Sequence, residues 1–532
     1  MNASSEATQS LWMAQAAPRS APALDASLTC DVAVVGAGMA GLSAAYEARL
    51  AGQEVIVLDR GPIAGGMSAR TTAHLASACD DFYHEYIRMR GEDEARVFHQ
   101  SQQAAIERIG AIQTAERIPC NFTRLDGYLF LGEGDDADLL AQEREACARI
   151  GFPGVEWAGK DAPAFLQGRP ALRFPYQARF HPMKYLLGLA DALTRRGVRI
   201  YAHTPVTSVA DEGEGVLVET ASGHAVRARA AIVATNSPIN DLIVIHTKQA
   251  PYRTYVIAAR CPADAVVDAL YWDTLDPYHY VRLQEASDGG DPWAIIGGED
   301  HKTGEAGDFD ERFARLEHWA RAMIPELGPV DHRWSGQVME PADAAPFVGR
   351  NPGDRNVYVV TGDSGQGMTT GAMAGMLLRD LVLGRESPWE QAYRPARASL
   401  RAAGEYMAEN AVMARNMTEY LTPGESGGLE GVAPGEGAVV RVGGQKVAAY
   451  RDPAGELHAF SAACTHAGCI VHWNALELCW DCPCHGSQFG VDGEPLNGPA
   501  LSPLAPWRAL GLSHARSRSS RISRVVRTSP KL

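Results

Sequence analysis

The chain has 532 residues, of which 46% are apolar and 21% charged, and its formal net charge at pH 7 is −15. This length allows several domains with separate cores, and so acidic a chain repels nucleic acid. No run of about 18 apolar residues lies outside a glycine-punctuated pattern, so we expect no transmembrane span.

The two termini differ in composition from the body of the chain. Residues 1–29 are rich in alanine, serine and proline, and we expect an arm lying over the first domain. They include Glu6 and lack a basic n-region and a twin arginine, which argues against an export signal and predicts a cytoplasmic protein. Residues 513–532 contain six Lys or Arg and no acid, which is typical of a solvated, disordered tail. Peripheral contact with an acidic partner or an anionic membrane surface is the alternative.

The cysteines are unevenly distributed. Five of the ten lie within residues 464–484, and the other five are scattered singly. This is not the even spacing of a secreted disulfide scaffold. It predicts one metal centre near the C-terminus and ordinary buried thiols elsewhere.

A dinucleotide-binding pattern begins at residue 31. Residues 31–35 predict a buried strand, 42–50 a helix and 55–58 a second strand that ends at Asp59, which can accept hydrogen bonds from ribose hydroxyls. Between the first strand and the helix lies a turn whose glycines allow close approach of a pyrophosphate to the helix N-terminus. These glycines are Gly36, Gly38 and Gly41.

Two further segments point to a flavin. Residues 65–74 are small and hydroxyl-rich, and a segment of this kind can follow a ribityl-pyrophosphate chain toward the flavin ring. A predicted strand at 357–360 leads through the glycine-rich turn 361–369 into a predicted helix at 371–383. The backbone amides of such a turn can face the pyrimidine edge of a flavin.

On these segments and on residues 231–236, the chain resembles the D-amino-acid dehydrogenase, glycine oxidase and sarcosine oxidase family of FAD enzymes over residues 30–385. The resemblance implies an α/β fold in which a Rossmann-like FAD-binding domain (about 30–80, 185–240 and 335–385) is interrupted by a sheet-based substrate domain (about 81–184 and 241–334). His74 is expected to hydrogen-bond near the flavin rather than to attach it covalently. Besides the three glycines and Asp59, the implied FAD-binding residues are Arg60, Ser68, Arg70, Thr71, His74, Val206, Gly362, Gly365, Gly367, Met368 and Thr369.

One predicted strand of the substrate domain has an unusual pattern. Tyr278, Tyr280 and Arg282 alternate, which places all three on one face of a sheet. A guanidinium beside two phenols can anchor a substrate carboxylate over the flavin. A solvated arginine with two tyrosines at the edge of the core explains the pattern equally well, and both interpretations stay open. His301 and Lys302, which follow two glycines, are predicted as turn residues rather than catalysts.

Helices and a linker organise the rest of the chain. Helical spacing predicts helices at 91–116 and 184–196. Residues 386–436 form a connector with a long helix at 396–421, followed by flexible Gly/Ser chemistry. From residue 437 to 512 the pattern changes to short strands and hairpin turns, which predicts a second, all-β domain.

This second domain contains two facing motifs of cysteine and histidine. The first is Cys464-x-His466 and the second, 15 residues further on, is Cys482-x-x-His485. A Rieske-type [2Fe–2S] cluster uses two thiolates on one iron and two imidazoles on the other. Structural zinc uses the same ligand types, but the pairing of one cysteine with one histidine on each loop favours iron–sulfur.

The segment resembles the Rieske family closely. The resemblance implies that Cys464 and Cys482 bind one iron and that His466 and His485 bind the other. Cys469 and Cys484 occupy matching places in the two loops and are placed to form a disulfide.

Two further positions bear on the reduction potential. Ser487 is placed to hydrogen-bond a cluster sulfur and raise the potential. Phe489 stands where high-potential relatives have a tyrosine, so we expect a potential below theirs. Cys479 has no place in the motif and is expected to be a buried thiol.

The complete chain resembles bacterial flavoproteins that fuse such an FAD module to a C-terminal Rieske domain. This implies an amine or amino-acid dehydrogenase in which a small-molecule substrate loses a hydride to FAD and electrons pass singly through the cluster to a quinone or a cytochrome. In one alternative, a donor such as a ferredoxin feeds the cluster and the flavin reduces or hydroxylates a substrate. In the other, the chain is an electron-transfer or redox-sensing module without its own substrate.

Overall fold

The computed structural model describes residues 6–160, 162–240, 245–397, 403–424 and 428–507. The predicted strand–helix–strand unit is present as β1 (Leu28–Val35), α2 (Met39–Leu50) and β2 (Val55–Leu58). Strand β1 pairs in parallel with β2 and with β10 (Ala225–Val233). All four residues of β2 and the last four of β1 are buried, as expected for the centre of a parallel sheet.

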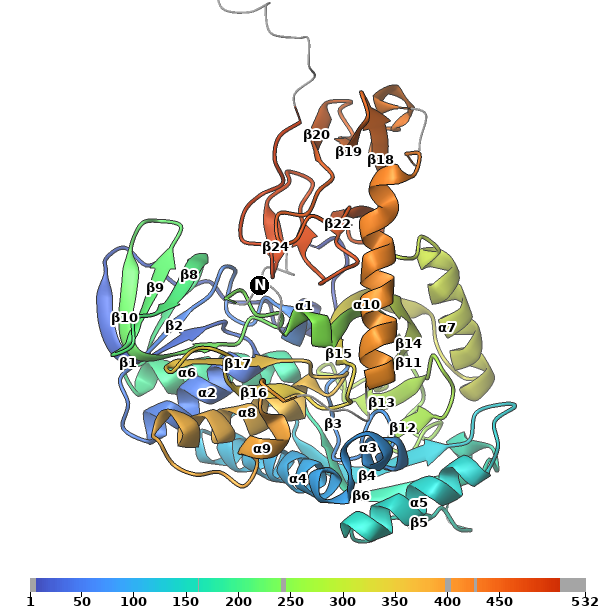
Figure 1. Cartoon of the computed structure of the whole chain (residues 1–532). Helices are drawn as coiled ribbons and strands as arrows, with labels where there is room; N and C mark the ends of the chain where they lie inside the picture. The colour runs from blue at the N-terminus through green and yellow to red at the C-terminus, as the bar shows by residue number, and fades with distance from the viewer. Residues whose placement is uncertain (1–5, 161, 241–244, 398–402, 425–427, 508–532) are drawn as a thin grey trace, which may run out of the picture.

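This first sheet has eight strands in the order β16-β17-β10-β1-β2-β7, with β9 paired to β10 and β8 paired to β9. Helix α8 (Gly367–Val382) follows β17 and packs against α2 on one face of the sheet (Figure 1). Helix α6 (Pro182–Arg195) corresponds to the helix predicted at 184–196. The remaining strands are β7 (Arg199–Tyr201), β8 (Val206–Asp211), β9 (Val216–Thr220), β16 (Phe347–Arg350) and β17 (Val357–Thr361).

A second sheet of nine strands forms the substrate domain. Its order is β15-β11-β14-β13-β12-β4-β6-β3, and β5 pairs with β6. The α/β fold with an inserted sheet is therefore confirmed. The strands are β3 (His74–Leu75), β4 (Thr123–Phe130), β5 (Glu156–Trp157), β6 (Ala171–Arg179), β11 (Gln249–Arg260), β12 (Leu270–Asp273), β13 (Tyr280–Gln284), β14 (Trp293–Lys302) and β15 (Val330–Pro341).

The segments that connect the strands of this sheet contain four helices: α3 (Tyr83–Arg90), α4 (Glu92–Ala115), α5 (Asp138–Ile150) and α7 (Phe309–Met323). Helix α4 confirms the helix predicted at 91–116. The prediction of a turn at His301 and Lys302 is wrong, because both residues pair with β11 at the end of β14. The preceding Gly297 does not break the strand. It makes room for the Tyr280 ring, since a Cβ at Gly297 would lie 2.2 Å from that ring.

The connector contains α9 (Glu390–Tyr393) and α10 (Ala403–Met417), which lies within the helix predicted at 396–421. Residues 398–402 of that prediction lie outside the described residues. Figure 1 shows α10 standing between the substrate sheet and the C-terminal domain. Most of the predicted Gly/Ser linker and the predicted basic tail lie outside the described residues. None of the described helices combines the length and the apolar character that a bilayer crossing requires.

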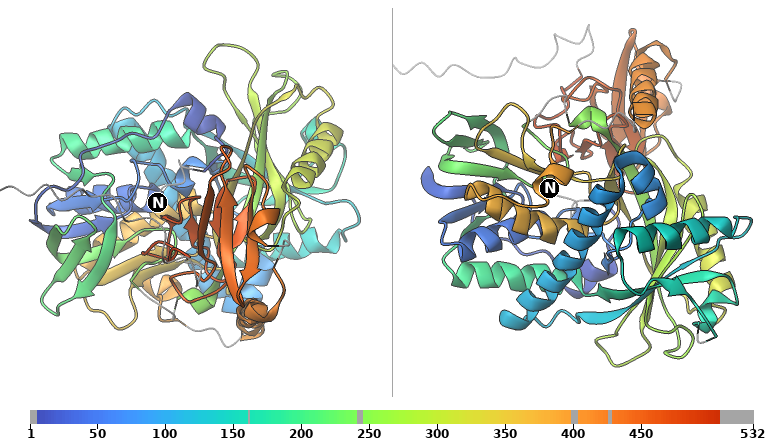
Figure 2. Two further views of the ribbon diagram at one scale, coloured as in Figure 1. Left: turned by 90° about the horizontal axis from the view of Figure 1, so that it is seen from above. Right: turned by 60° about the horizontal axis from the view of Figure 1, so that its bottom comes forward.

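The C-terminal domain is built from two small antiparallel sheets. One has β18 (Gly437–Val442), β19 (Gln445–Arg451) and β20 (Leu457–Ser461), and the other has β21 (His472–Asn474), β22 (Cys479–Asp481), β23 (Gln488–Phe489) and β24 (Pro495–Asn497). Seen from above, this domain lies over the junction of the two larger sheets (Figure 2). The N-terminal arm, with α1 (Leu11–Gln15), reaches the same place, where Ala7 N donates to Glu477 O.

Candidate active site and metal centre

The main cavity of the molecule begins at the first glycine-rich turn and continues to the substrate sheet. It contains about 1630 Å³ of free space, part of it open to solvent. Ten of the predicted FAD-binding residues line it: Gly36, Gly38, Asp59, Ser68, Arg70, Thr71, His74, Gly365, Gly367 and Met368.

The glycine-rich turn has the shape that a bound pyrophosphate requires. Gly36 has a φ of +115°, and a Cβ there would lie 2.3 Å from Ala234 O. A Cβ at Gly41 would lie 1.9 Å from Gly36 O, so Gly41 holds the helix against the turn rather than lining the cavity. Asp59 stabilises the turn, since its carboxylate accepts hydrogen bonds from Ala37 N (2.6 Å) and Gly61 N (2.9 Å).

A second pocket continues from the main cavity past Gly36 and Asp59. Val206 and Arg60, two of the residues predicted to bind FAD, line it. Its opposite wall comes from the C-terminal domain, through Leu496 and Gly498. Arg60 Nη1 also donates to Pro495 O at 2.8 Å. The C-terminal domain thus closes this end of the site, which nothing in the sequence indicated.

Two predicted FAD-binding residues, Gly362 and Thr369, are not among the cavity-lining residues. Gly362 has a φ of +71° and forms the turn between β17 and α8. Thr369 Oγ1 donates to Gln366 O within the first turn of α8. Both shape the turn that presents Gly365 and Gly367 to the cavity.

The residues of the cavity fit a dinucleotide cofactor. Asn236 Nδ2 lines the cavity, is buried and has no acceptor among the described residues. An unsatisfied buried amide is costly, so a bound ligand with an acceptor is its expected partner. Ser68 Oγ accepts from Met39 N (3.0 Å) at the start of α2, which fixes the segment that follows the second strand.

The structure separates the three residues predicted to bind substrate. Tyr278 and Tyr280 line the cavity side by side, with ring centroids 5.2 Å apart. Arg282 is fully buried, and its guanidinium donates to Ala73 O (2.8 Å) and Phe180 O (2.9 Å). Arg282 does not line the cavity, so the expected carboxylate anchor is not formed there. The alternative of a solvated arginine is also wrong, because the side chain is fully buried and bonded to backbone carbonyls.

Carboxylates that sequence reasoning missed occupy the end of the cavity near the tyrosines. Burial raises the pKa of Asp300 to about 7 and that of Asp363 to about 6. Burial, reinforced by neighbouring carboxylates, raises the pKa of Asp80 and of Glu340 well above the usual range. The pair Asp80-Asp81 and the Asp363 within the second glycine-rich turn were visible signals in the sequence, but their convergence depends on the fold.

In the C-terminal domain, the predicted ligands converge from two loops, residues 464–469 and 482–487, called here the cluster loops. His466 Nδ1 and His485 Nδ1 face each other at 3.2 Å. The thiols of Cys464 and Cys482 share a hydrogen bond, which lowers the pKa of Cys464 to about 7 and raises that of Cys482. Two thiols and two imidazole nitrogens directed at one space fit the donor set of a [2Fe–2S] cluster.

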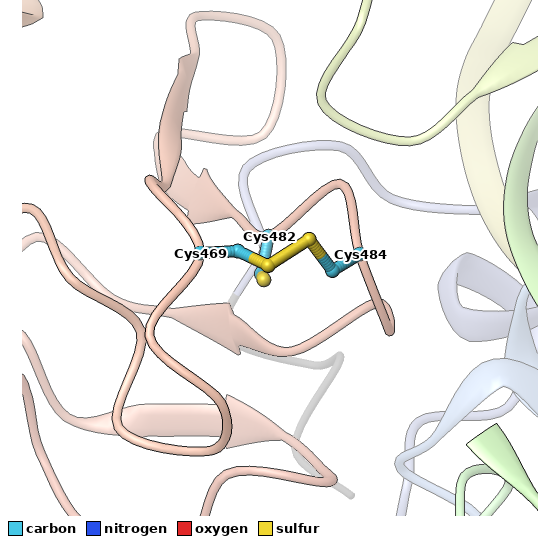
Figure 3. Close-up of side chains that lie close together, drawn as sticks. All are labelled: Cys469, Cys482 and Cys484. Carbon is cyan, nitrogen blue, oxygen red and sulfur yellow. A yellow bond between two sulfur atoms is a disulfide. The ribbon is translucent and has the colours of Figure 1, made fainter. Parts of the chain in front are cut away.

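A disulfide joins the cluster loops. Cys469 and Cys484 are bonded, with an S–S distance of 1.97 Å, and Cys482 lies beside them (Figure 3). The three sulfur atoms lie within 4.8 Å of one another. They are not a separate metal site, because a metal ligand must be a thiolate and two of these sulfurs are in a disulfide. The predicted pairing is thus present.

The structure also places the three further residues of this domain that were considered in the sequence, Ser487, Phe489 and Cys479. Ser487 hydrogen-bonds the Cys464 thiol, and its Oγ accepts from Ala500 N at 3.0 Å. Phe489 is fully buried and pairs with Trp480. Cys479 is a buried thiol, as expected, and lies 3.6 Å from Asp481 Oδ1.

The histidine side of the cluster loops faces the substrate domain. The ring of His246, which begins a short 3-10 helix (His246–Lys248), lies 4.8 Å from the ring of His466 and 5.4 Å from that of His485. Burial and these two neighbours lower the pKa of His485 to about 3, which keeps it neutral as a metal ligand must be. His485 is buried and His466 is partly exposed.

Buried ion pairs connect the C-terminal domain to the rest of the molecule. Arg70 contacts Glu6 (2.7 Å) and Glu477 (3.1 Å), and Arg253 contacts Asp481 (3.2 Å). All five side chains are at most 3% exposed. We call these five residues the interdomain ion cluster. Breaking one member leaves an uncompensated buried charge, so the cluster fixes the relative position of the domains.

One neutral side chain also connects the two sites. Gln337, on β15, lines the main cavity and donates through Nε2 to Gly486 O at 3.0 Å. Gly486 directly follows the ligand His485. A Cβ at Gly486 would lie 2.7 Å from Gln337 Nε2, so the Gly486 backbone packs directly against the Gln337 side chain.

Comparisons with known proteins agree with both sites. The model of the DAO family of FAD-dependent oxidoreductases matches residues 31–381, and the Rieske [2Fe-2S] domain model matches residues 427–508. A Bacillus subtilis (strain 168) protein, YhfW, described as a Rieske 2Fe-2S iron-sulfur protein, is 32% identical over 94% of this chain and 97% of its own length.

Other relatives cover the flavin module. Gamma-glutamylputrescine oxidoreductase of Escherichia coli (strain K12) is 28% identical over 70% of this chain and 89% of its own length. The crystal structure of glycine oxidase from Geobacillus kaustophilus shares the fold, with a TM-score of 0.58 and 19% identity over 70% of this chain and 99% of that one. The chain therefore belongs to the DAO family of FAD-dependent oxidoreductases and contains a C-terminal Rieske domain, so its cofactors are FAD and a [2Fe–2S] cluster.

Proposed function

We propose that this protein dehydrogenates an amine or an amino acid at the carbon bearing the nitrogen, and that the electrons leave singly through the Rieske cluster to an external acceptor. The observation that carries this proposal is the position of Gln337 between the two sites. This side chain lines the main cavity and donates a hydrogen bond to Gly486 O, beside His485 in the second cluster loop. Names of relatives, such as glycine oxidase and gamma-glutamylputrescine oxidoreductase, support the substrate class.

When bound, FAD supplies a two-electron acceptor for the hydride and the cluster supplies a one-electron carrier. The chain's own residues line the cavity and hold the substrate. Tyr278 and Tyr280 stay protonated, because burial raises the pKa of both phenols well above the usual range. His74 stays neutral, because burial and Arg282 lower its pKa to about 3. The substrate end of the cavity therefore offers neutral hydrogen-bonding groups and carboxylates.

The external acceptor is proposed to approach the first cluster loop. Thr465 and Ala467 are exposed and flank the partly exposed His466. We consider three kinds of carrier as the external partner: a quinone, a cytochrome or a ferredoxin. We also propose a cytoplasmic location for the protein. The reverse flow, in which the cluster feeds a flavin reductase or monooxygenase, uses the same contacts, and so does a redox-sensing module. A substrate cavity with its own polar residues favours an enzyme over a sensing module.

Anaerobic mixing of the full-length holoprotein with a panel of amines and amino acids tests the proposal. We expect the flavin absorption to bleach and the visible absorption of the oxidised cluster to decrease afterwards. No bleaching by any amine or amino acid, together with reduction by a ferredoxin or by NAD(P)H, would support the reverse flow or the redox-sensing module instead. The visible spectra of the two centres distinguish these results in one experiment.

A further inference from the structure

The substrate end of the main cavity is acidic and aromatic. Its carboxylates come from a loop after β3, from β14, from β15 and from the turn before α8, and its two tyrosines lie just before β13 and at its first position. They are Asp80, Tyr278, Tyr280, Asp300, Glu340 and Asp363. We call this set the acidic end.

Contacts within the acidic end hold its members in place. Tyr278 Oη donates to Asp80 Oδ2 at 3.3 Å, and a Cβ at Gly365 would lie 2.9 Å from the same oxygen. Glu340 Oε2 accepts from Ser364 at 2.5 Å. Because Ser364 and Gly365 belong to the turn expected at the flavin edge, these carboxylates lie where a substrate meets the cofactor.

Two carboxylate oxygens in this region lack a partner. Oδ1 of Asp300 and Oδ1 of Asp363 are buried and accept no hydrogen bond from any described residue. A buried acceptor without a donor is costly. Both atoms belong to cavity-lining residues, so a ligand that brings donors would satisfy them.

The described residues that line the cavity supply no free cation to this end. Among the described residues that line the cavity, the basic ones are Arg70 and His74. The nitrogens of Arg70 are bonded to Glu6, Glu477, Thr8 and Ser335 in the direction of the C-terminal domain. His74 is neutral, for the reason given above.

We propose that the substrate is an amine with a second cationic nitrogen, a diamine or polyamine, whose distal ammonium binds the acidic end. This inference rests on the proposed function and deepens it. The ammonium would form charge-assisted hydrogen bonds with Asp300 and Glu340, and the rings of Tyr278 and Tyr280 add cation–π attraction. An α-amino acid would bring its own carboxylate among these acids with no guanidinium to receive it, so it is disfavoured by like-charge repulsion.

Anaerobic stopped-flow bleaching of the flavin in the full-length holoprotein tests this, with 1,4-diaminobutane, butylamine, 4-aminobutanoate and glycine. We expect the second-order rate constant for the diamine to exceed that for butylamine at least about tenfold, equivalent to about 1.4 kcal/mol, and the two amino acids to be slower still. Bleaching by glycine or 4-aminobutanoate as fast as by the diamine would overturn the inference and leave the proposed function intact. A diamine no faster than butylamine would also overturn it.

A non-oxidisable dication separates binding from chemistry. We expect 1,4-bis(trimethylammonio)butane to perturb the absorption of the oxidised flavin and to compete with amines. If no amine bleaches the flavin but the dication still binds, the proposed function fails and the cation site stands. If the dication does not perturb the flavin spectrum at any concentration, the cation site is wrong.

Isosteric variants locate the site. In Asp300→Asn and Glu340→Gln we expect the diamine-to-butylamine ratio and the affinity for the dication to fall about tenfold each, with flavin content and far-UV circular dichroism retained. Asp310→Asn is the matched control, because this side chain is 80% exposed and does not line the cavity. An unchanged ratio and an unchanged dication affinity in both cavity variants would contradict the proposal.

Discussion

The two cofactor sites are built in opposite ways. The cluster site is local: its ligands and its disulfide lie between Cys464 and His485, and each cluster loop is closed by its own backbone hydrogen bonds, such as Gly468 N to Cys464 O and Gly486 N to Cys482 O. The flavin cavity is assembled from segments between Gly36 and Gly371. A local site is positioned as a unit, whereas an assembled site depends on how distant segments pack.

The contacts between the two sites therefore matter as much as the sites themselves. The C-terminal domain provides a wall of the second pocket, through Leu496 and Gly498, and the substrate domain covers the histidine side of the cluster loops with His246. Each site is completed by the other domain. We therefore expect substitutions at the interface between the domains to affect both FAD and the [2Fe–2S] cluster. Substitutions within the cluster loops should affect the [2Fe–2S] cluster alone.

The largest effect is expected from Arg253→Ala in the interdomain ion cluster. The variant leaves Asp481 without its buried counter-charge, and we expect the free energy of unfolding to fall by about 3–5 kcal/mol. Urea titration followed by flavin and cluster absorption measures this. The control is Arg333→Ala, whose ion pair with Asp310 is exposed and worth about 0–1 kcal/mol. Equal losses in the two variants would contradict the role of the interdomain ion cluster.

Removal of the disulfide is expected to affect the cluster and spare the flavin. In the double variant Cys469→Ser and Cys484→Ser, we expect a loss of about 3 kcal/mol for a loop of this length. Iron analysis and electron paramagnetic resonance after reduction should show reduced cluster occupancy, with FAD content near the native value. Loss of FAD in parallel with iron would show that the cluster loops are not an independent unit.

Retention of FAD is expected to depend on the contact across the second pocket. Arg60→Ala removes the hydrogen bond to Pro495 O, and a bond from a charged donor is worth about 1.5–3 kcal/mol. We expect the dissociation constant of FAD to rise about tenfold or more, measured by fluorescence of released FAD on dilution. Arg385→Ala, an exposed arginine, serves as the control. An unchanged dissociation constant would mean that the C-terminal domain does not hold the adenine end.

The interdomain ion cluster also predicts a pH dependence. Burial is the main cause that raises the pKa of Glu6 from 4.5 to about 7. Because the folded-state pKa is raised, its contribution to stability is present below pH 4.5 and is lost as pH rises through about 7. We expect the free energy of unfolding to decrease less steeply over this range in Glu6→Gln than in the native protein. Urea titrations at several pH values measure the slopes, and identical slopes would exclude Glu6 as the titrating group.

The smallest change concerns the cluster potential. Phe489 is buried on β23, two residues after Ser487. In Phe489→Tyr, the added hydroxyl is expected to raise the reduction potential by giving the cluster region another donor. Redox titration followed by circular dichroism of the cluster checks this, with flavin potential as the internal control. A potential equal to or below that of the native protein would contradict it.

The features that could be predicted from the sequence are those that depend on short, local segments of the chain. The strand–turn–helix–strand unit ending at Asp59, and the pattern from Cys464 to His485, depend on neighbours in the chain, and their residue types are dictated by local geometry. The fold class and both cofactors were predicted from them, and the structure and the comparisons confirm both.

Long-range packing determined what the sequence did not reveal. The alternation of Tyr278, Tyr280 and Arg282 suggested one common face, but the Arg282 guanidinium turns to the carbonyl groups of Ala73 and Phe180. Asp300 and Glu340 reach the cavity only because β14 and β15 both pair with β11. The closure of the second pocket by Leu496 depends on domain docking. None of these contacts has a signature within a short window of sequence.

The most direct test of the account is a single-turnover experiment without external acceptor. Full-length holoprotein is mixed anaerobically with a diamine and frozen at successive times, and flavin absorption and the electron paramagnetic resonance signal of the reduced cluster are followed together. We predict that the flavin bleaches first and that the reduced cluster then appears in the same molecules, at a rate independent of protein concentration. A fully bleached flavin beside a cluster that stays oxidised would contradict the claim that electrons leave the cavity through the cluster.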